Sequence, residues 1–157
     1  MPRLSHKISI LISLILTFLL LIALGFAAYW VPELVESALN VNDNLGNRTE
    51  VSENGRFLVL LDAYAMLTVA AVAVILLFFL LRTVQREEVF TPLTTRLLSA
   101  VSLCCFAEGV LFALLVPLFQ LAVGIALAAC FLGLCLRVVG NVIDEASRIK
   151  SENDFTI

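Results

Sequence analysis

The stretch SLCCFAEGVLF, at residues 102–112, places one carboxyl group, Glu108, among residues that are otherwise apolar or small. Residues 97–116 are long and apolar enough to cross a membrane, because a spanning helix needs roughly 20 apolar residues. Counted from Leu97 at about 1.5 Å per residue, Glu108 lies roughly 16 Å into a hydrocarbon core about 30 Å thick. A central acid costs about 2.5–3.5 kcal/mol on insertion scales, so we expect this carboxyl to face neighbouring helices rather than lipid.

Two interpretations of Glu108 are open. It is a proton or cation site in the first, since intramembrane acids commonly mark ion pathways. In the second, which we favour from the sequence, it is a neutral acid that hydrogen-bonds to a neighbouring helix. A Glu108→Gln change would then be nearly silent, because Gln keeps the shape and still donates and accepts hydrogen bonds.

Asp62 is the candidate partner of Glu108. It belongs to a second apolar stretch, residues 57–81. If this helix enters from the outer surface at Phe57, Asp62 lies roughly 7–8 Å below that surface and about 6 Å from the level of Glu108. Two carboxyl groups at such heights on adjacent helices can share a proton or bind a cation. The simpler interpretation, which we favour for Asp62, is an acid close enough to the interface to reach water.

Other residue types that could do chemistry do not form a recognisable site. The four cysteines lack the close C-x₂-C spacing of structural zinc sites, and neither neighbouring pair lines one helix face: Cys104, Cys105, Cys130 and Cys135. Buried, inert thiols are therefore expected. His6 is the only histidine and lies in a basic, solvated N-terminal segment. Nucleophile, metalloprotease and phosphate-loop motifs are absent from the sequence, so we expect no cofactor, no metal and no enzymatic activity.

The elements that must position these residues are transmembrane helices. The chain of 157 residues is 61% hydrophobic and 15% charged, whereas soluble domains are about 45–50% apolar and about 25% charged. The sequence predicts an all-α polytopic protein, a single four-helix transmembrane domain over residues 1–157. The predicted spans are residues 8–31, 57–81, 97–116 and 118–139. So few residues separate the last two spans that we predict a helical hairpin.

The distribution of basic residues predicts the orientation of these helices. Eight of the ten Lys and Arg residues fall in the N-terminal segment, in residues 82–96 or in the C-terminal end from Arg137 onward, and two fall in residues 32–56. By the positive-inside rule, both termini and the 82–96 loop are cytoplasmic, and the 32–56 loop lies outside the cell membrane. The net charge of −3 is too small to indicate a nucleic-acid partner.

Local signals mark helix ends and packing faces. Pro32 suits the first turn of a short interfacial helix, and Thr91 followed by Pro92 predicts the beginning of the third helix. Apolar residues at helical spacing extend the fourth helix into an amphipathic cytoplasmic tail, residues 140–157. The fourth span also carries small residues every four positions, which let helices approach closely within the molecule or between copies in a homo-oligomer: Gly124 and Ala128, and Ala122, Ala126 and Cys130.

Two short stretches carry a family resemblance. The middle loop contains QREEVFTP and the chain ends in SENDFTI. With four spans in so short a chain, this resembles the bacterial family of small membrane proteins catalogued as domain of unknown function 2975. The resemblance is carried by Phe90, Thr91 and Pro92 in the loop and by Glu152, Asn153, Asp154, Phe155, Thr156 and Ile157 in the tail.

The resemblance implies a partner but no chemistry. Members of this family are often encoded beside a small helix-turn-helix regulator, which implies a cytoplasmic protein that binds the loop and the tail. The sequence therefore favours a non-enzymatic interaction or regulatory protein of the lipid bilayer. The alternative is a small proton- or cation-coupled transporter that uses Glu108 with Asp62.

Overall fold

The computed structural model describes the backbone of residues 2–44, 52–85 and 91–154, and the side chains of residues 11–41, 52–85 and 91–149. Within these ranges the fold is all-helical. Its four helices are α1 (Pro2–Asn44), α2 (Glu53–Gln85), α3 (Pro92–Leu114) and α4 (Ala122–Asp154). The all-α fold predicted from composition is confirmed.

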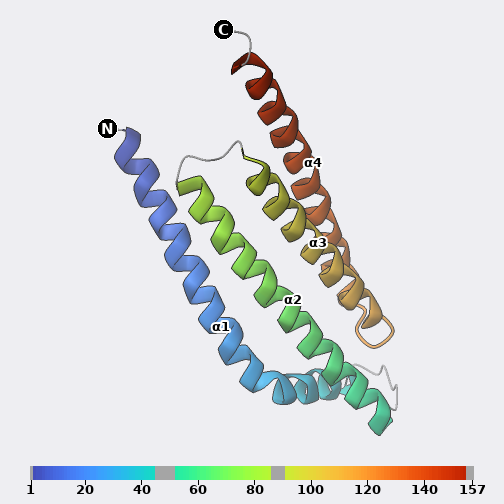
Figure 1. Ribbon diagram of the computed structural model, residues 1–157. Helices are drawn as coiled ribbons and strands as arrows, with labels where there is room; N and C mark the ends of the chain where they lie inside the picture. Colours follow the sequence, from blue (N-terminus) through green and yellow to red (C-terminus); the bar gives the residue numbers. More distant parts are fainter. Residues whose placement is uncertain (1, 45–51, 86–90, 155–157) are drawn as a thin grey trace.

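The helices pack in chain order. Among the described residues, α1 contacts α2, α2 contacts α3, and α3 contacts α4, while no other pair of helices comes together. Figure 1 shows them running up and down in alternation. The beginnings of α1 and α3 and the ends of α2 and α4 therefore lie at one end of the molecule. In this order α2 and α3 are the two central helices. A site in the middle of the protein therefore lies at the interface between them.

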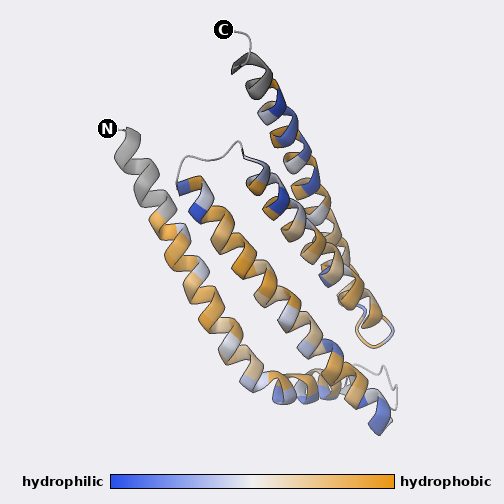
Figure 2. Cartoon of the chain, viewed as in Figure 1, coloured by the Kyte–Doolittle hydropathy of each residue, from blue (hydrophilic) through white to orange (hydrophobic). Residues whose placement is uncertain are grey.

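All four helices are long and apolar enough to cross a membrane. Figure 2 shows apolar colour along the length of α1 and α2 and hydrophilic residues gathered toward the helix ends. Only 6% of the apolar window in α1 and in α2 is buried inside the protein, so most of their large apolar side chains face outward. Lipid tails accept such a surface and water does not. The protein is a multi-pass membrane protein.

Helix α1 does not end where the sequence analysis expected. We predicted a separate interfacial helix beginning at Pro32, but Pro32 lies inside α1, which continues to Asn44. A proline inside a helix removes one backbone hydrogen bond and its ring crowds the preceding turn, so it bends the helix. Figure 1 shows α1 changing direction in its last third and crossing the beginning of α2. The predicted short helix is thus a bent extension of the first span.

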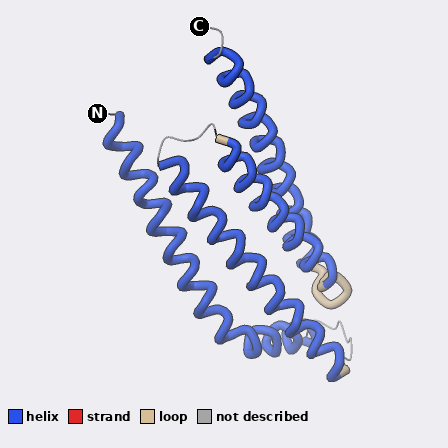
Figure 3. Tube along the Cα trace, viewed as in Figure 1, coloured by secondary structure: helices blue, strands red, loops and turns tan. Residues whose placement is uncertain are grey.

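Helix α3 begins as its sequence predicts. Thr91 is the N-cap residue in extended conformation and Pro92 opens the helix. At the other end, residues 115–121 form the turn that is drawn as a loop in Figure 3. Backbone hydrogen bonds close this turn, including Phe119 N–H to the Leu115 carbonyl at 2.8 Å and Ala122 N–H to the Phe119 carbonyl at 2.9 Å. The predicted α3–α4 hairpin is confirmed, although α4 begins at Ala122 rather than at residue 118.

Small residues let α3 and α4 approach each other closely. A Cβ added at Gly133 would lie 3.2 Å from the Ser102 carbonyl oxygen and 3.3 Å from the Cβ of Cys105. Ser102 is fully buried, and its hydroxyl donates a hydrogen bond of 2.7 Å to the Gly133 carbonyl. Close packing of backbones and interhelical hydrogen bonds drive helix association in membranes, where lipid is as apolar as the side chains. Helices α3 and α4 therefore form a tightly packed hairpin.

Ser102→Ala should destabilise the protein slightly. The change removes the hydrogen bond to Gly133 but leaves no large cavity, and such bonds in membranes contribute about 0.6 kcal/mol and at most about 1.7 kcal/mol. Thermal unfolding of the detergent-solubilised protein measures the loss. Ser147→Ala is the matched control, because the Ser147 hydroxyl donates to Ile143 within its own helix at 2.8 Å. An equal loss in both variants would contradict an interhelical role for Ser102.

Candidate functional site

The two intramembrane acids lie on neighbouring helices. Asp62 belongs to α2 and Glu108 to α3, and both side chains are partly buried. The carboxyl group of Glu108 interacts electrostatically with that of Asp62 and lies beside the backbone of Ala70 on α2. The structure therefore places the two predicted site residues on neighbouring helices at different heights, because Ala70 lies eight residues after Asp62 and about 12 Å further along the axis of α2.

Each acid has a buried oxygen that lacks a hydrogen-bond partner. These atoms are Oδ2 of Asp62 and Oε1 of Glu108. A buried polar atom without a partner is costly, and two carboxylates near each other also repel when both are ionised. A proton bound to either carboxyl group removes its charge and so reduces both penalties. The arrangement can bind a positive charge.

Two thiols lie beside this acid pair. Cys104 is one helical turn before Glu108, and Glu108 interacts electrostatically with both Cys104 and Cys105. No group of three or more His, Cys, Asp or Glu side chains suited to a metal ion occurs within the part of the chain that the structure describes. A Cβ added at Gly109 on α3 would lie only 2.5 Å from the Sγ of Cys130 on α4. Cys130 is therefore a packing residue against α3.

The predicted partner-binding residues fall at one end of the molecule. Thr91 and Pro92 begin α3, and Glu152, Asn153 and Asp154 form the last turn of α4. The side chains of these last three, and Phe90, Phe155, Thr156 and Ile157, lie outside the described side chains. Figure 1 shows that the beginning of α3 and the last turn of α4 are both at this end. The described parts of the two stretches, Thr91 and Pro92 and the backbone of residues 152–154, are thus at the same end of the protein.

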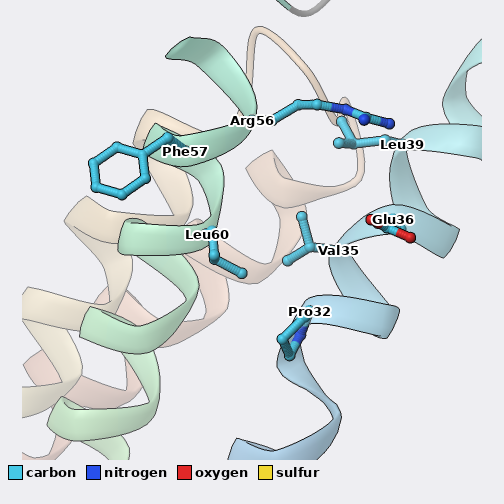
Figure 4. A pocket seen from close by; sticks show the side chains of 7 residues that line it. All are labelled: Pro32, Val35, Glu36, Leu39, Arg56, Phe57 and Leu60. Atoms are coloured by element: carbon cyan, nitrogen blue, oxygen red, sulfur yellow. The ribbon is translucent and has the colours of Figure 1, made fainter. Parts of the chain in front are cut away.

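Sequence reasoning missed a groove at the opposite end. A hollow of about 160 Å³ lies between the bent part of α1 and the first turns of α2. Figure 4 shows Arg56 and Leu60 reaching from α2 toward α1, whereas the ring of Phe57 points away from α1. The residues that line the hollow are Pro32, Val35, Glu36, Leu39, Arg56, Phe57 and Leu60. The available signal was the pair of opposite charges, Glu36 and Arg56, at the adjoining ends of the first two spans. Glu36 and Arg56 line the same hollow because α1 bends.

A comparison with known protein families gives a match. A family model described as protein of unknown function (DUF2975) matches residues 23–157. The match covers the second half of α1 and all of α2, α3 and α4, so the acid pair and the groove both lie within it. Comparisons with curated proteins and with solved structures give no match.

Proposed function

We propose that this chain, which belongs to the DUF2975 family of proteins of unknown function, is a non-enzymatic membrane protein that binds a proton or a small cation between α2 and α3. The observation that carries the proposal is the Asp62–Glu108 pair, in which each acid has a buried oxygen without a hydrogen-bond partner. The structural interpretation of Glu108, in which its carboxyl group hydrogen-bonds to a neighbouring helix, is the alternative, and the backbone of Ala70 on α2 is the partner it would use.

The composition of the pair favours a proton or a single monovalent cation. Calcium takes six to eight oxygen ligands, and magnesium requires near-octahedral oxygen coordination. Asp62 and Glu108 together supply at most four carboxyl oxygens. A small charge that moves between two carboxyl groups is also the chemistry of intramembrane proton relays. We therefore propose a carrier of protons or small cations rather than a divalent-metal site.

Sealed vesicles that contain the purified protein test this proposal. With an imposed proton or sodium gradient, wild-type vesicles should show a dye-reported flux that protein-free vesicles lack. The ion that carries the flux identifies the bound species, since replacing sodium by an impermeant cation leaves only a proton-coupled signal. Equal signals from vesicles with and without the protein would contradict the proposal.

A second function is favoured by the positions of the loop and the tail. We propose that the end formed by the beginning of α3 and the last turn of α4 is cytoplasmic and binds a protein, which by family resemblance is a helix-turn-helix regulator. A partner bound at this end would contact two chain segments at once. This binding and the ion site lie on different parts of the molecule, so one chain can have both.

Deleting residues 151–157 should abolish partner binding without preventing membrane insertion. The deletion removes the family-like ENDFTI segment and shortens α4 only beyond Lys150. Affinity capture from solubilised membranes, with the full-length and the shortened chain at equal abundance, gives the measurement. If both chains capture the same cytoplasmic proteins in the same amounts, the tail is not the binding element.

A reporter experiment tests the proposed orientation. A reporter that works only in the cytoplasm should be active when fused after Ile157 and inactive when inserted within residues 44–53. The physical reason is the excess of Lys and Arg at the end that contains both termini and the 82–96 loop. The opposite pattern of activity would reverse the proposed orientation.

A further inference from the structure

We expect the groove between α1 and α2 to lie at the level of the membrane surface. Tyr29 and Trp30 come directly before it on α1, and both are exposed. Amphipathic aromatic rings of this kind settle at the boundary between lipid tails and headgroups. The two charged groove residues, Glu36 and Arg56, lie where α1 has bent away from the membrane-spanning direction and α2 has just begun. A ligand of this groove must therefore be reachable from the headgroup layer.

The lining of the groove is apolar within and charged at its edge. Leu39 is buried at 5% exposure, and Val35 and Leu60 are partly buried, so they form the apolar part. Glu36 and Arg56 are both exposed. Figure 4 shows the Arg56 side chain reaching from α2 toward α1, on which Glu36 lies. The groove therefore offers one negative and one positive group beside an apolar surface.

The two charges do not neutralise each other. Among the side chains that the structure describes, no salt bridge joins Glu36 to Arg56, although one joins Arg148 to Glu145 at 3.1 Å. Each charge is thus available to a ligand group of the opposite sign. A ligand that carries an anion and a cation a short distance apart, attached to an apolar body, is complementary to the whole groove.

We propose that this groove binds the headgroup of phosphatidylethanolamine from the surrounding bilayer. The guanidinium of Arg56 has the fork of N–H donors that suits a phosphate. The carboxylate of Glu36 accepts hydrogen bonds from a primary ammonium, which has three N–H donors. A choline headgroup has no N–H to donate, and a glycerol headgroup has no positive charge. The groove therefore selects phosphatidylethanolamine over phosphatidylcholine and phosphatidylglycerol.

The size of the groove agrees with a headgroup. Its volume of about 160 Å³ is close to that of a cavity of about 150 Å³, which holds a benzene-sized group. A group of that size enters the groove, and the rest of the lipid stays in the bilayer. Its acyl chains can lie on the exposed apolar surface that continues from Phe57 to Leu61 along α2.

Native mass spectrometry of the full chain tests the proposal. The protein is reconstituted in vesicles of equal phosphatidylethanolamine, phosphatidylcholine and phosphatidylglycerol, extracted in mild detergent, and its retained lipids are counted. Wild type should retain phosphatidylethanolamine about tenfold above phosphatidylcholine, the ratio expected for one charge-assisted hydrogen bond. Glu36→Gln should remove this preference, and Arg56→Gln should reduce the retention of all three lipids.

Matched variants separate this site from general lipid contact. Glu33→Gln changes an exposed acid on the same helix that does not line the groove, and Arg82→Gln changes an exposed Arg at the other end of α2. Both should retain lipids as wild type does. Thermal unfolding of each variant verifies that it is folded. Equal retention of the three lipids by wild type, or an unchanged preference in folded Glu36→Gln, would overturn the proposal.

Discussion

Gly109→Ala should lower the thermal unfolding temperature of the protein markedly. The added Cβ would lie 2.5 Å from the Sγ of Cys130 and 3.2 Å from the carbonyl oxygen of Ala126. The first distance is shorter than atoms tolerate, so the side chain of Cys130 or the α4 backbone must move. Overpacking of this kind costs about 1–3 kcal/mol. For a chain of this size that is a shift of roughly 2–12 °C, measured by thermal unfolding in detergent.

Two further variants identify the cause of this loss. Gly124→Ala is the matched control, because a Cβ added at Gly124 has no heavy atom within 4 Å. The stability of this variant should not fall. Cys130→Ala removes the Sγ atom, so the double variant Gly109→Ala, Cys130→Ala should recover part of the stability. Residues in contact are expected to show such non-additivity. Strictly additive losses would show that the two residues do not meet in the folded protein.

The sequence predicted which residues form α4 but could not tell which of its faces meets α3. Two rows of small residues were equally good candidates for close packing. The structure buries Ala122 and Ala126, whereas Gly124 and Ala128 are exposed. In a soluble protein the polar face of a helix reveals its orientation, but lipid and protein interior are both apolar. The rotation of a membrane helix about its axis therefore depends on packing that is not visible in hydropathy.

The unknown rotation of each helix about its axis also limited what the sequence could predict for the two acids. Counting residues gave the approximate depths of Asp62 and Glu108, because depth follows from the rise per residue. Whether the two side chains face each other depends on the rotation of α2 and α3. The high cost of an acid in lipid was the one sequence-level argument that Glu108 faces protein. For Asp62, that argument was weaker, since an acid near the interface can reach water. The structure brings Asp62 within electrostatic reach of Glu108.

The bend of α1 could not be read from Pro32 alone. A proline is equally compatible with the first turn of a new helix and with a bend inside a continuous one. The continuing helix makes contact with α2 beyond the bend, where Leu39 is buried. Burial of this kind compensates for the hydrogen bond that the proline removes. This tertiary contact, which the local sequence does not specify, also creates the groove.

The ion-site proposal makes a strong prediction for Glu108. Glu108→Gln should abolish the proton- or cation-dependent flux of vesicles, leaving the signal of protein-free vesicles. Gln keeps the shape of Glu and its ability to hydrogen-bond but cannot ionise or carry the transported proton. The variant should remain folded, because a neutral side chain beside Asp62 also removes the repulsion between two carboxylates. Flux and thermal unfolding are measured on the same preparation.

Asp62→Asn and Glu145→Gln complete this experiment. In the proposed ion site Asp62 acts together with Glu108, so its Asn variant should also lose flux. Glu145→Gln changes an exposed acid near the end of α4 and should leave the flux unchanged. If Asp62→Asn keeps part of the flux, Glu108 alone holds the ion and Asp62 only raises the affinity. A folded Glu108→Gln protein with undiminished flux would contradict the ion site. Glu108 would then be the structural acid that the sequence alone favours, and the function of the chain would rest on its cytoplasmic partner.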